Sequence, residues 1–200
     1  MNDHLIRMQK WLGSNRPFAA SEVLTAGIPR HILTRLCSQG VISHVECGIY
    51  LPADARVTEN LSLQIMALRV PRCVICLLSA LRFHNFTTQV SPDVWIALKQ
   101  HSRIPAMSHL STRVVMLSEE PFQYGVEEHD IDGIKIRVYS AAKTVADCFK
   151  FRNQIGLDAA LEALRDGFRQ KLFTVSELMD AAKVCRVSKV ITPYVESIFS

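Results

Sequence analysis

The chain has 200 residues, of which 48% are hydrophobic and 21% charged, and its formal net charge at pH 7 is +4. This composition excludes a disordered protein, and the length allows one large domain or two small ones. The most apolar run, residues 70–81, contains Pro71 and Arg72 and is too short to span a bilayer. Residues 1–13 follow an amphipathic helical pattern without the apolar core of a signal peptide. We therefore expect a cytoplasmic protein that does not insert into a membrane.

Positive charge is distributed unevenly along the chain. Residues 1–54 carry five Lys or Arg against four Asp or Glu, and residues 55–110 carry six against two. Residues 111–200 carry twelve against thirteen. Because the overall excess is small and lies mostly in the middle of the chain, net charge alone does not identify a nucleic-acid-binding protein.

The N-terminal part is patterned as three helices. Apolar residues at helical spacing predict the first helix over residues 5–12. A short second helix, capped by Ser21, stops at Gly27. A third helix starts with Pro29 in its first turn and ends at Gly40.

Two short apolar runs follow these helices, over residues 41–42 and 49–51. The Cys47-Gly48 pair between them suits a tight hairpin turn. A short helix, a turn, a second helix and a hairpin are the elements of a winged helix-turn-helix, which usually places its second helix in the DNA major groove.

The helix over residues 29–39 is the candidate recognition helix. The predicted DNA-binding side chains are those off its apolar stripe, with one from the wing: Arg30, His31, Thr34, Arg35, Ser38 and His44. Arginine bonds guanine or phosphate, and Thr and Ser bond bases or backbone. The alternatives are a solvated helix face and a protein-binding module. The wing, with His44 and Glu46 as its polar side chains, is weakly charged, so we expect it to hold phosphate weakly.

The polar stretch after Pro52 indicates a domain boundary. We predict a winged helix-turn-helix domain over residues 1–54 and a second domain over residues 55–200. The expected helices of the second domain are residues 61–68, 74–86, 141–151, 157–168, 175–182 and 187–199, and its expected strands are residues 94–98, 113–117, 126–131 and 134–138. The predicted fold class is therefore α+β, with an N-terminal winged helix-turn-helix followed by a mixed α/β domain that has a small sheet and a helical C-terminal half.

The cysteines are scattered and several lie in apolar stretches: Cys37, Cys47, Cys73, Cys76, Cys148 and Cys185. Reduced, mostly buried thiols are the expected state. Cys73 and Cys76 form a single Cys-x-x-Cys pair, whereas a closed zinc site needs four ligands. We therefore favour core thiols and expect neither a metal nor a cofactor.

Few residues of the second domain carry recognisable chemistry. Lys143 and Asp147, spaced i, i+4, are either catalytic or, more often, a structural salt bridge. The acidic residues at 127–132 either hold a metal or form a solvated hairpin rim. No phosphate-binding glycine loop, nucleophile elbow or zinc-protease motif is present. We assign no catalytic residue and expect no enzyme, since an enzyme would need Asp147, Asp130 and His84 gathered in one pocket.

Four stretches of the chain resemble one family in the expected order. Residues 26–52, AGIPRHILTRLCSQGVISHVECGIYLP, resemble the N-terminal winged-helix domain of the AbiEi-type antitoxins of bacterial abortive-infection, type IV toxin–antitoxin systems. Residues 79–87 (SALRFHNFT), residues 136–152 (IRVYSAAKTVADCFKFR) and residues 159–164 (AALEAL) resemble the C-terminal domain of that family.

This resemblance implies an autoregulatory repressor. The N-terminal domain would bind an inverted repeat of double-stranded DNA in the promoter of its own operon. The C-terminal domain would counteract a cognate nucleotidyltransferase-like toxin without forming a stable complex with it. The family often has a basic residue just before the Gly-x-Tyr of the wing, where this chain has Cys47. That departure shifts the expected phosphate contacts to Arg30 and Arg35, helped by the basic middle segment with Arg56, Arg69, Arg72 and Arg82.

Two other functions stay open from the sequence. One is a stand-alone transcriptional regulator whose C-terminal domain senses a ligand or a protein. The other is a nucleic-acid-processing enzyme that uses the winged helix to hold its substrate. We expect a monomer or a weak dimer, because two copies can meet on an inverted repeat without a stable dimer in solution. The apolar positions of residues 187–199 can pack either on their own domain or on a second chain.

Overall fold

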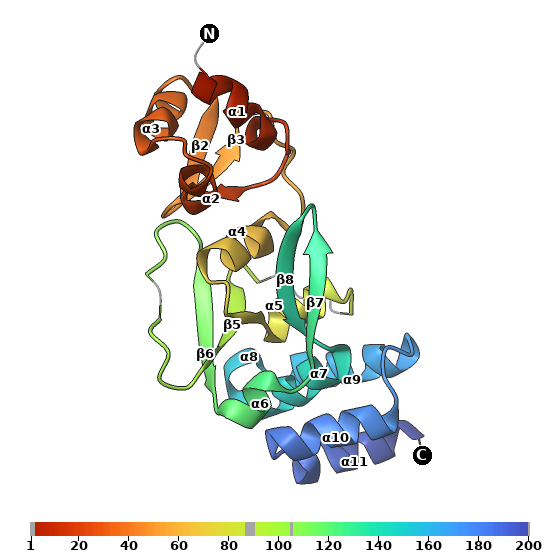
Figure 1. Ribbon diagram of the computed structural model, residues 1–200. Helices are drawn as coiled ribbons and strands as arrows, with labels where there is room; N and C mark the ends of the chain where they lie inside the picture. The colour runs from red at the N-terminus through yellow and green to blue at the C-terminus, as the bar shows by residue number, and fades with distance from the viewer. Residues whose placement is uncertain (1–2, 87–90, 105, 200) are drawn as a thin grey trace. The chain divides into compact units, whose positions relative to one another are not determined.

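The computed structural model describes residues 3–86, 91–104 and 106–199 (Figure 1). The chain has an α+β fold and divides into two compact units. The first unit comprises the described residues of Met1–Arg72, Pro105–Leu110 and Asp130–Ile136, and the second comprises those of Cys73–Ile104, Ser111–His129 and Arg137–Ser200. This division differs from the predicted boundary after residue 54, because the helix that follows that boundary and two later segments belong to the first unit.

The first unit contains the predicted three helices and hairpin. A three-stranded antiparallel sheet has the order β1-β3-β2. The elements of this unit are α1 (Asp3–Leu12), β1 (Phe18–Ala19), α2 (Ala20–Thr25), α3 (Arg30–Ser38), β2 (Ile42–Glu46), β3 (Ile49–Pro52) and α4 (Leu61–Arg69). Three apolar residues of α3, Ile32, Leu33 and Leu36, are buried in one core with Met8 and Trp11. The predicted apolar stripe of α3 therefore faces the interior.

The start of α2 differs from the prediction. Its N-cap residue is Ala19 rather than Ser21, which is exposed. The Glu22 carboxylate accepts the Ala19 N–H at 2.9 Å and also pairs with Arg16 at 3.3 Å. A carboxylate in the first helical turn satisfies a free backbone donor and complements the helix dipole, so no capping hydroxyl is needed.

The second unit is built on a five-stranded sheet with the order β6-β5-β4-β8-β7, whose β7–β8 hairpin tip belongs to the first unit. Strand β5 pairs in parallel with β6 and antiparallel with β4, and β4 pairs in parallel with β8. The strands are β4 (Val74–Ile75), β5 (Val94–Lys99), β6 (Thr112–Leu117), β7 (Val126–Ile131) and β8 (Ile134–Tyr139). The helices are α5 (Leu77–Phe83), α6 (Glu119–Gln123), α7 (Ala141–Lys150), α8 (Arg152–Ile155), α9 (Leu157–Arg169), α10 (Val175–Cys185) and α11 (Ser188–Phe199).

The helix predicted over residues 74–86 is wrong at its start. Val74 and Ile75 form β4, because they pair with Ala97 and Ile96 of β5, and α5 begins only at Leu77. Tertiary pairing therefore outweighs the helical pattern of this apolar run. The short helices α6 and α8 were not predicted either. Thr87, which ends the second family-like motif, lies outside the described residues.

Local residues account for the β7–β8 turn and for the start of α7. Asp132 and Gly133 have φ values of 54° and 78°, which suit the two central positions of the tight hairpin turn. The Ser140 side chain caps α7 by accepting the Lys143 N–H. Gly125, with φ +68°, lies so close to α7 that an added Cβ would stand 2.8 Å from the Cβ of Lys143. Only glycine fits this approach of the chain before β7 to the start of α7.

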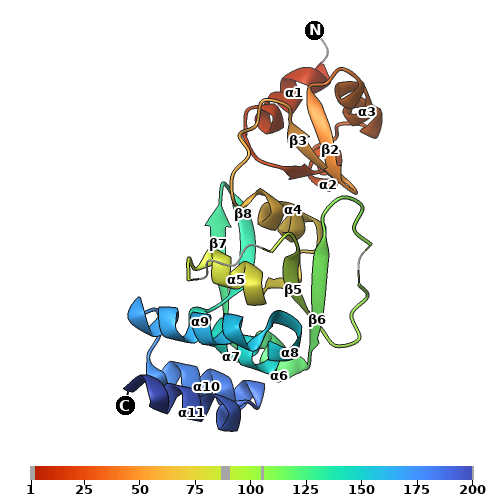
Figure 2. The same cartoon turned by 180° about the vertical axis from the view of Figure 1, so that it is seen from behind.

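The C-terminal helices gather at one end of the sheet, with α7 in contact with α5, α9, α10 and α11 (Figure 2). All nine residues from Ala141 to Phe149 are buried. The apolar positions Val187, Ile191 and Val195 pack into the same core, so α11 covers its own unit. None of the helices within the described residues has the length and apolarity needed to cross a membrane.

Candidate functional site

The exposed face of α3 carries all five of the side chains predicted for it, namely Arg30, His31, Thr34, Arg35 and Ser38. The Ser38 hydroxyl donates to the Arg35 carbonyl at 2.8 Å, whereas the Arg35 guanidinium has no ion-pair partner among the described residues. No acidic residue occurs within α3. This helix therefore presents a face that is polar, basic and free of carboxylates.

The turn before α3 is held in place by α1. The guanidinium of Arg7 donates to the Ala26 carbonyl at 2.6 Å, at the end of α2. Gly27 follows with φ +76°, and an added Cβ would lie 3.6 Å from the same guanidinium. The buried side chain of Ile28 then anchors the chain just before α3. These contacts fix the direction of α3 relative to the two helices before it.

The β2–β3 hairpin places His44 on the surface. Its ring lies 5.2 Å from the Tyr50 ring and 6.2 Å from the His109 ring, measured between centroids. Cys47, at the turn, is also exposed. The hairpin surface therefore contributes one exposed imidazole at the predicted position, and its role in DNA binding stays a prediction.

Glu46 is not a surface side chain of this hairpin, contrary to the sequence-based expectation. Its carboxylate is fully buried and accepts four backbone N–H groups, from Cys47 at 2.8 Å, Ser108 at 2.9 Å, His109 at 3.0 Å and Leu110 at 3.2 Å. Burial by itself opposes ionisation, but the four donors outweigh it and lower the pKa of Glu46 to about 2. Its negative charge is consequently not presented on the hairpin surface.

Lys143 and Asp147 form the ion pair that their i, i+4 spacing favoured, and this pair is buried. The Lys143 Nζ lies 2.5 Å from Asp147 Oδ2 and 4.2 Å from the centroid of the Tyr139 ring. The Cys185 thiol donates to the other carboxylate oxygen at 3.3 Å, and burial, reinforced by the Asp147 charge, raises the pKa of Cys185 to about 12. Both charged side chains are closed off from solvent. Asp147 therefore cannot reach a substrate in this structure.

The other chemically suggestive residues are also engaged within the fold. Asp130 accepts the Gly133 N–H at 2.8 Å, and Asp132 accepts a hydrogen bond from Gln64 at 2.9 Å. Cys73 and Cys76 are buried free thiols; burial raises the pKa of Cys73 to about 12 and that of Cys76 well above its ordinary value. Within the described part of the chain, no three His, Cys, Asp or Glu side chains are grouped so as to hold a metal ion.

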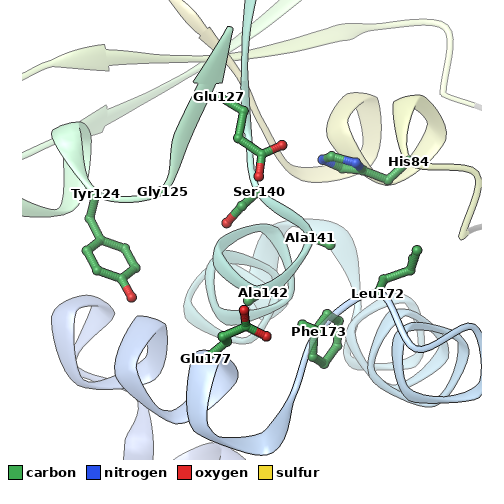
Figure 3. A pocket seen from close by; sticks show the side chains of 10 residues that line it. All are labelled: His84, Tyr124, Gly125, Glu127, Ser140, Ala141, Ala142, Leu172, Phe173 and Glu177. Carbon is green, nitrogen blue, oxygen red and sulfur yellow. The ribbon is translucent and has the colours of Figure 1, made fainter. Parts of the chain in front are cut away.

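A pocket of about 360 Å³ opens in the second unit, and we call it the acidic pocket. Its lining residues are His84, Tyr124, Gly125, Glu127, Ser140, Ala141, Ala142, Leu172, Phe173 and Glu177. In Figure 3 the carboxylates of Glu127 and Glu177 point into the hollow from opposite sides, and the Tyr124 hydroxyl approaches it from a third. Sequence reasoning missed this site because its walls come from residues almost a hundred positions apart.

No protein-family model matches the chain, and no curated protein matches it either. The resemblance to AbiEi-type antitoxins therefore rests on the sequence motifs alone.

Hydrogen bonds and burial determine the protonation states of Glu177 and His84 in the acidic pocket. The Thr174 backbone N–H and hydroxyl bond Glu177 at 2.7 and 2.9 Å and lower its pKa, so this carboxylate is ionised at neutral pH. His84 Nε2 lies 2.7 Å from the Tyr139 carbonyl and must carry the proton of that hydrogen bond. Burial lowers the pKa of His84, so the ring is neutral at pH 7 and its Nδ1 is an acceptor. The side chains of this pocket thus offer mainly acceptors.

Proposed function

We propose that the first unit is a winged helix-turn-helix that binds double-stranded DNA through α3. In this proposal the whole chain is a cytoplasmic autoregulatory antitoxin of the AbiEi type. It represses its own operon and opposes a nucleotidyltransferase-like toxin without a stable complex. Two copies would occupy the two halves of an inverted repeat.

The observation that carries the DNA-binding proposal is the outer face of α3. The five predicted contact residues of α3 are all exposed, while the apolar side of the same helix is buried. They are Arg30, His31, Thr34, Arg35 and Ser38. Arginine forms bidentate hydrogen bonds with guanine and contacts phosphate, and hydroxyls accept or donate to either. Among the described residues neither guanidinium of α3 has an ion-pair partner, and α3 contains no carboxylate, so its positive charge complements the negative charge of DNA.

The β2–β3 hairpin supports the proposal in a more limited way. Because the Glu46 carboxylate is buried, the hairpin does not repel phosphate with it. His44 is the one predicted contact that this hairpin offers. We therefore assign most of the phosphate contacts in the first unit to Arg30 and Arg35.

The test is a pair of double variants of the full chain, measured by fluorescence anisotropy with duplex DNA from upstream of its own gene. Arg30→Ala with Arg35→Ala should weaken binding roughly 100-fold at about 0.1 M salt and flatten the salt dependence. The matched control, Arg165→Ala with Lys189→Ala, removes the same charge from exposed positions of the second unit and should bind like the unmodified protein. Equal affinities of the two double variants would refute the assignment of α3.

Co-expression with the product of a neighbouring nucleotidyltransferase gene tests the antitoxin part. The Arg30→Ala, Arg35→Ala variant should still rescue growth, because both changes lie on the surface of the first unit. It should no longer repress a reporter placed behind its own promoter. Loss of rescue in this stable variant, or no rescue by the unmodified chain, would contradict a separate antitoxin role for the second unit.

A second candidate function is favoured by the acidic pocket. A stand-alone transcriptional regulator needs a ligand site outside its DNA-binding unit, and the acidic pocket lies wholly within the second unit. A genomic neighbourhood without a nucleotidyltransferase gene would favour this function over the antitoxin. The enzyme hypothesis gains no such support, since Asp147 is enclosed in the core.

A further inference from the structure

The acidic pocket has a marked imbalance of charge. Of the ten described residues that line it, two are glutamates and none is a lysine or an arginine. Both carboxylates point into the same hollow from opposite walls (Figure 3). A small anion such as phosphate would meet two negative charges there, so the site selects against it.

Three nearby features that can be positive do not reverse this preference. The first is His129, whose Nε2 lies 3.4 Å from the Glu127 carboxylate, but a single imidazole does not offset two glutamates. The start of α7 lines the pocket through Ser140, Ala141 and Ala142, but a helix N-terminus contributes about half a unit of positive charge. Lys143, in the same first turn, is buried on Asp147 at 2.5 Å and is neutralised by it. The two glutamates therefore dominate the potential of the hollow.

The remaining walls are apolar and well supported. Leu172 and Phe173 line one side, and the Phe173 ring packs against Phe168 with centroids 5.1 Å apart. Gly167 lies directly under this ring, because an added Cβ would stand 2.3 Å from it. On the other side, the close approach of Gly125 to α7 holds the chain that carries Tyr124. The hollow is thus shaped by packed elements.

We propose that the acidic pocket binds a small organic cation with a primary amino or guanidino group, attached to a short apolar chain. Glu127 and Glu177 accept hydrogen bonds from the charged group or groups, and Tyr124 and the Nδ1 of His84 complete the set of acceptors. The alkyl part lies along Leu172 and Phe173. A volume of about 360 Å³ suits a free ligand of this size. This site is separate from α3, so the proposal does not depend on DNA binding.

The experiment is calorimetric titration of the full chain, without DNA, by agmatine, putrescine, butanol and butyrate. Agmatine and putrescine should bind with Kd values below about 1 mM, more weakly as salt is raised, while butanol and butyrate should not bind. An arginine tripeptide blocked at both ends identifies the source of the cation. Binding weaker than that of agmatine fits a free metabolite, and equal binding shows that a basic side chain of a protein enters the same pocket.

Two variants in which glutamate is replaced by uncharged glutamine locate the binding. Glu127→Gln with Glu177→Gln should raise the Kd of agmatine at least about tenfold. Glutamine at position 177 can still serve in the capping box with Thr174, and thermal unfolding of the variant verifies the fold. The matched control is Glu59→Gln with Glu120→Gln, which removes the same charge from exposed positions outside the pocket and should leave the affinity unchanged. No binding of either amine, or equal binding by the double variant, would overturn the proposal.

Discussion

Each of the two units encloses a carboxylate, and the two are stabilised by different means. Glu46 of the first unit is surrounded by four backbone N–H donors, three of which come from Ser108, His109 and Leu110. Asp147 of the second unit is satisfied by side chains, namely the Lys143 ammonium and the Cys185 thiol. The first arrangement fixes a loop against a hairpin, and the second fixes one helix within a core.

This difference determines how each carboxylate responds to mutation. Only substitution by proline removes a backbone donor, so any other single substitution can weaken the Glu46 contact only at the carboxylate itself. Side-chain donors can be removed singly, which leaves a buried charge without its partner. The second unit should therefore lose more stability than the first when one partner of its buried carboxylate is replaced.

The largest effect is expected from Lys143→Met. The substitution keeps most of the side-chain volume but leaves the Asp147 carboxylate buried without a cation. The free energy of unfolding should therefore fall by about 3–5 kcal/mol. Chemical denaturation of the full chain measures this loss.

The matched control for this variant is the double change Lys143→Met with Asp147→Leu. Replacing a buried ion pair by apolar residues often changes the stability little, so the double variant should be more stable than Lys143→Met alone. If both variants were equally unstable, packing around the lysine chain rather than the unpaired carboxylate would be the cause.

A smaller effect is expected from Glu46→Gln. The amide keeps one acceptor oxygen but turns an NH₂ group toward backbone donors, so we expect a loss of about 2–3 kcal/mol at pH 7. The exposed Glu59 provides the matched control, because Glu59→Gln should change the stability by less than about 0.5 kcal/mol.

The pH dependence of the stability distinguishes the contribution of the Glu46 charge from that of its side-chain packing. The pKa of Glu46 is lowered in the folded state to about 2 from an ordinary value of 4.5, so its contribution to stability is fully present above pH 4.5 and is lost as the pH falls through 2. The gap in stability between the unmodified protein and Glu46→Gln should therefore shrink steadily over this interval. A gap that stays constant from pH 7 to pH 2.5 would show that the carboxylate charge does not stabilise the loop.

The same two carboxylates show what the sequence could and could not predict. Residues 5–40 have clear apolar spacing and strong glycine signals, and their three helices were predicted with small errors at the ends. Lys143 and Asp147 form the structural ion pair that their i, i+4 spacing favoured, and its burial has a signal in the sequence, since residues 141–149 are apolar on all sides of the helix apart from a few polar positions.

No comparable signal exists for Glu46. Its partners follow it by 62 to 64 residues, and they bind it through N–H groups that every non-proline residue has. The sequence contains no signal for the acidic pocket either, because Glu127 of β7 and Glu177 of α10 come to line one pocket only in the folded chain. Long-range packing, rather than local pattern, creates both features.

The smallest expected effect concerns the second donor to Asp147. Cys185→Ala removes the thiol hydrogen bond at 3.3 Å and leaves a small cavity, while the Lys143 ion pair remains. The loss should be about 1–2 kcal/mol, less than for Lys143→Met, because a thiol is a weak donor and the carboxylate keeps its cation. Cys185→Ser retains a donor of similar size and should be the more stable of the two variants in the same denaturation assay. Serine no better than alanine would mean that the thiol contributes by packing alone, so that Asp147, unlike Glu46, depends on a single strong partner.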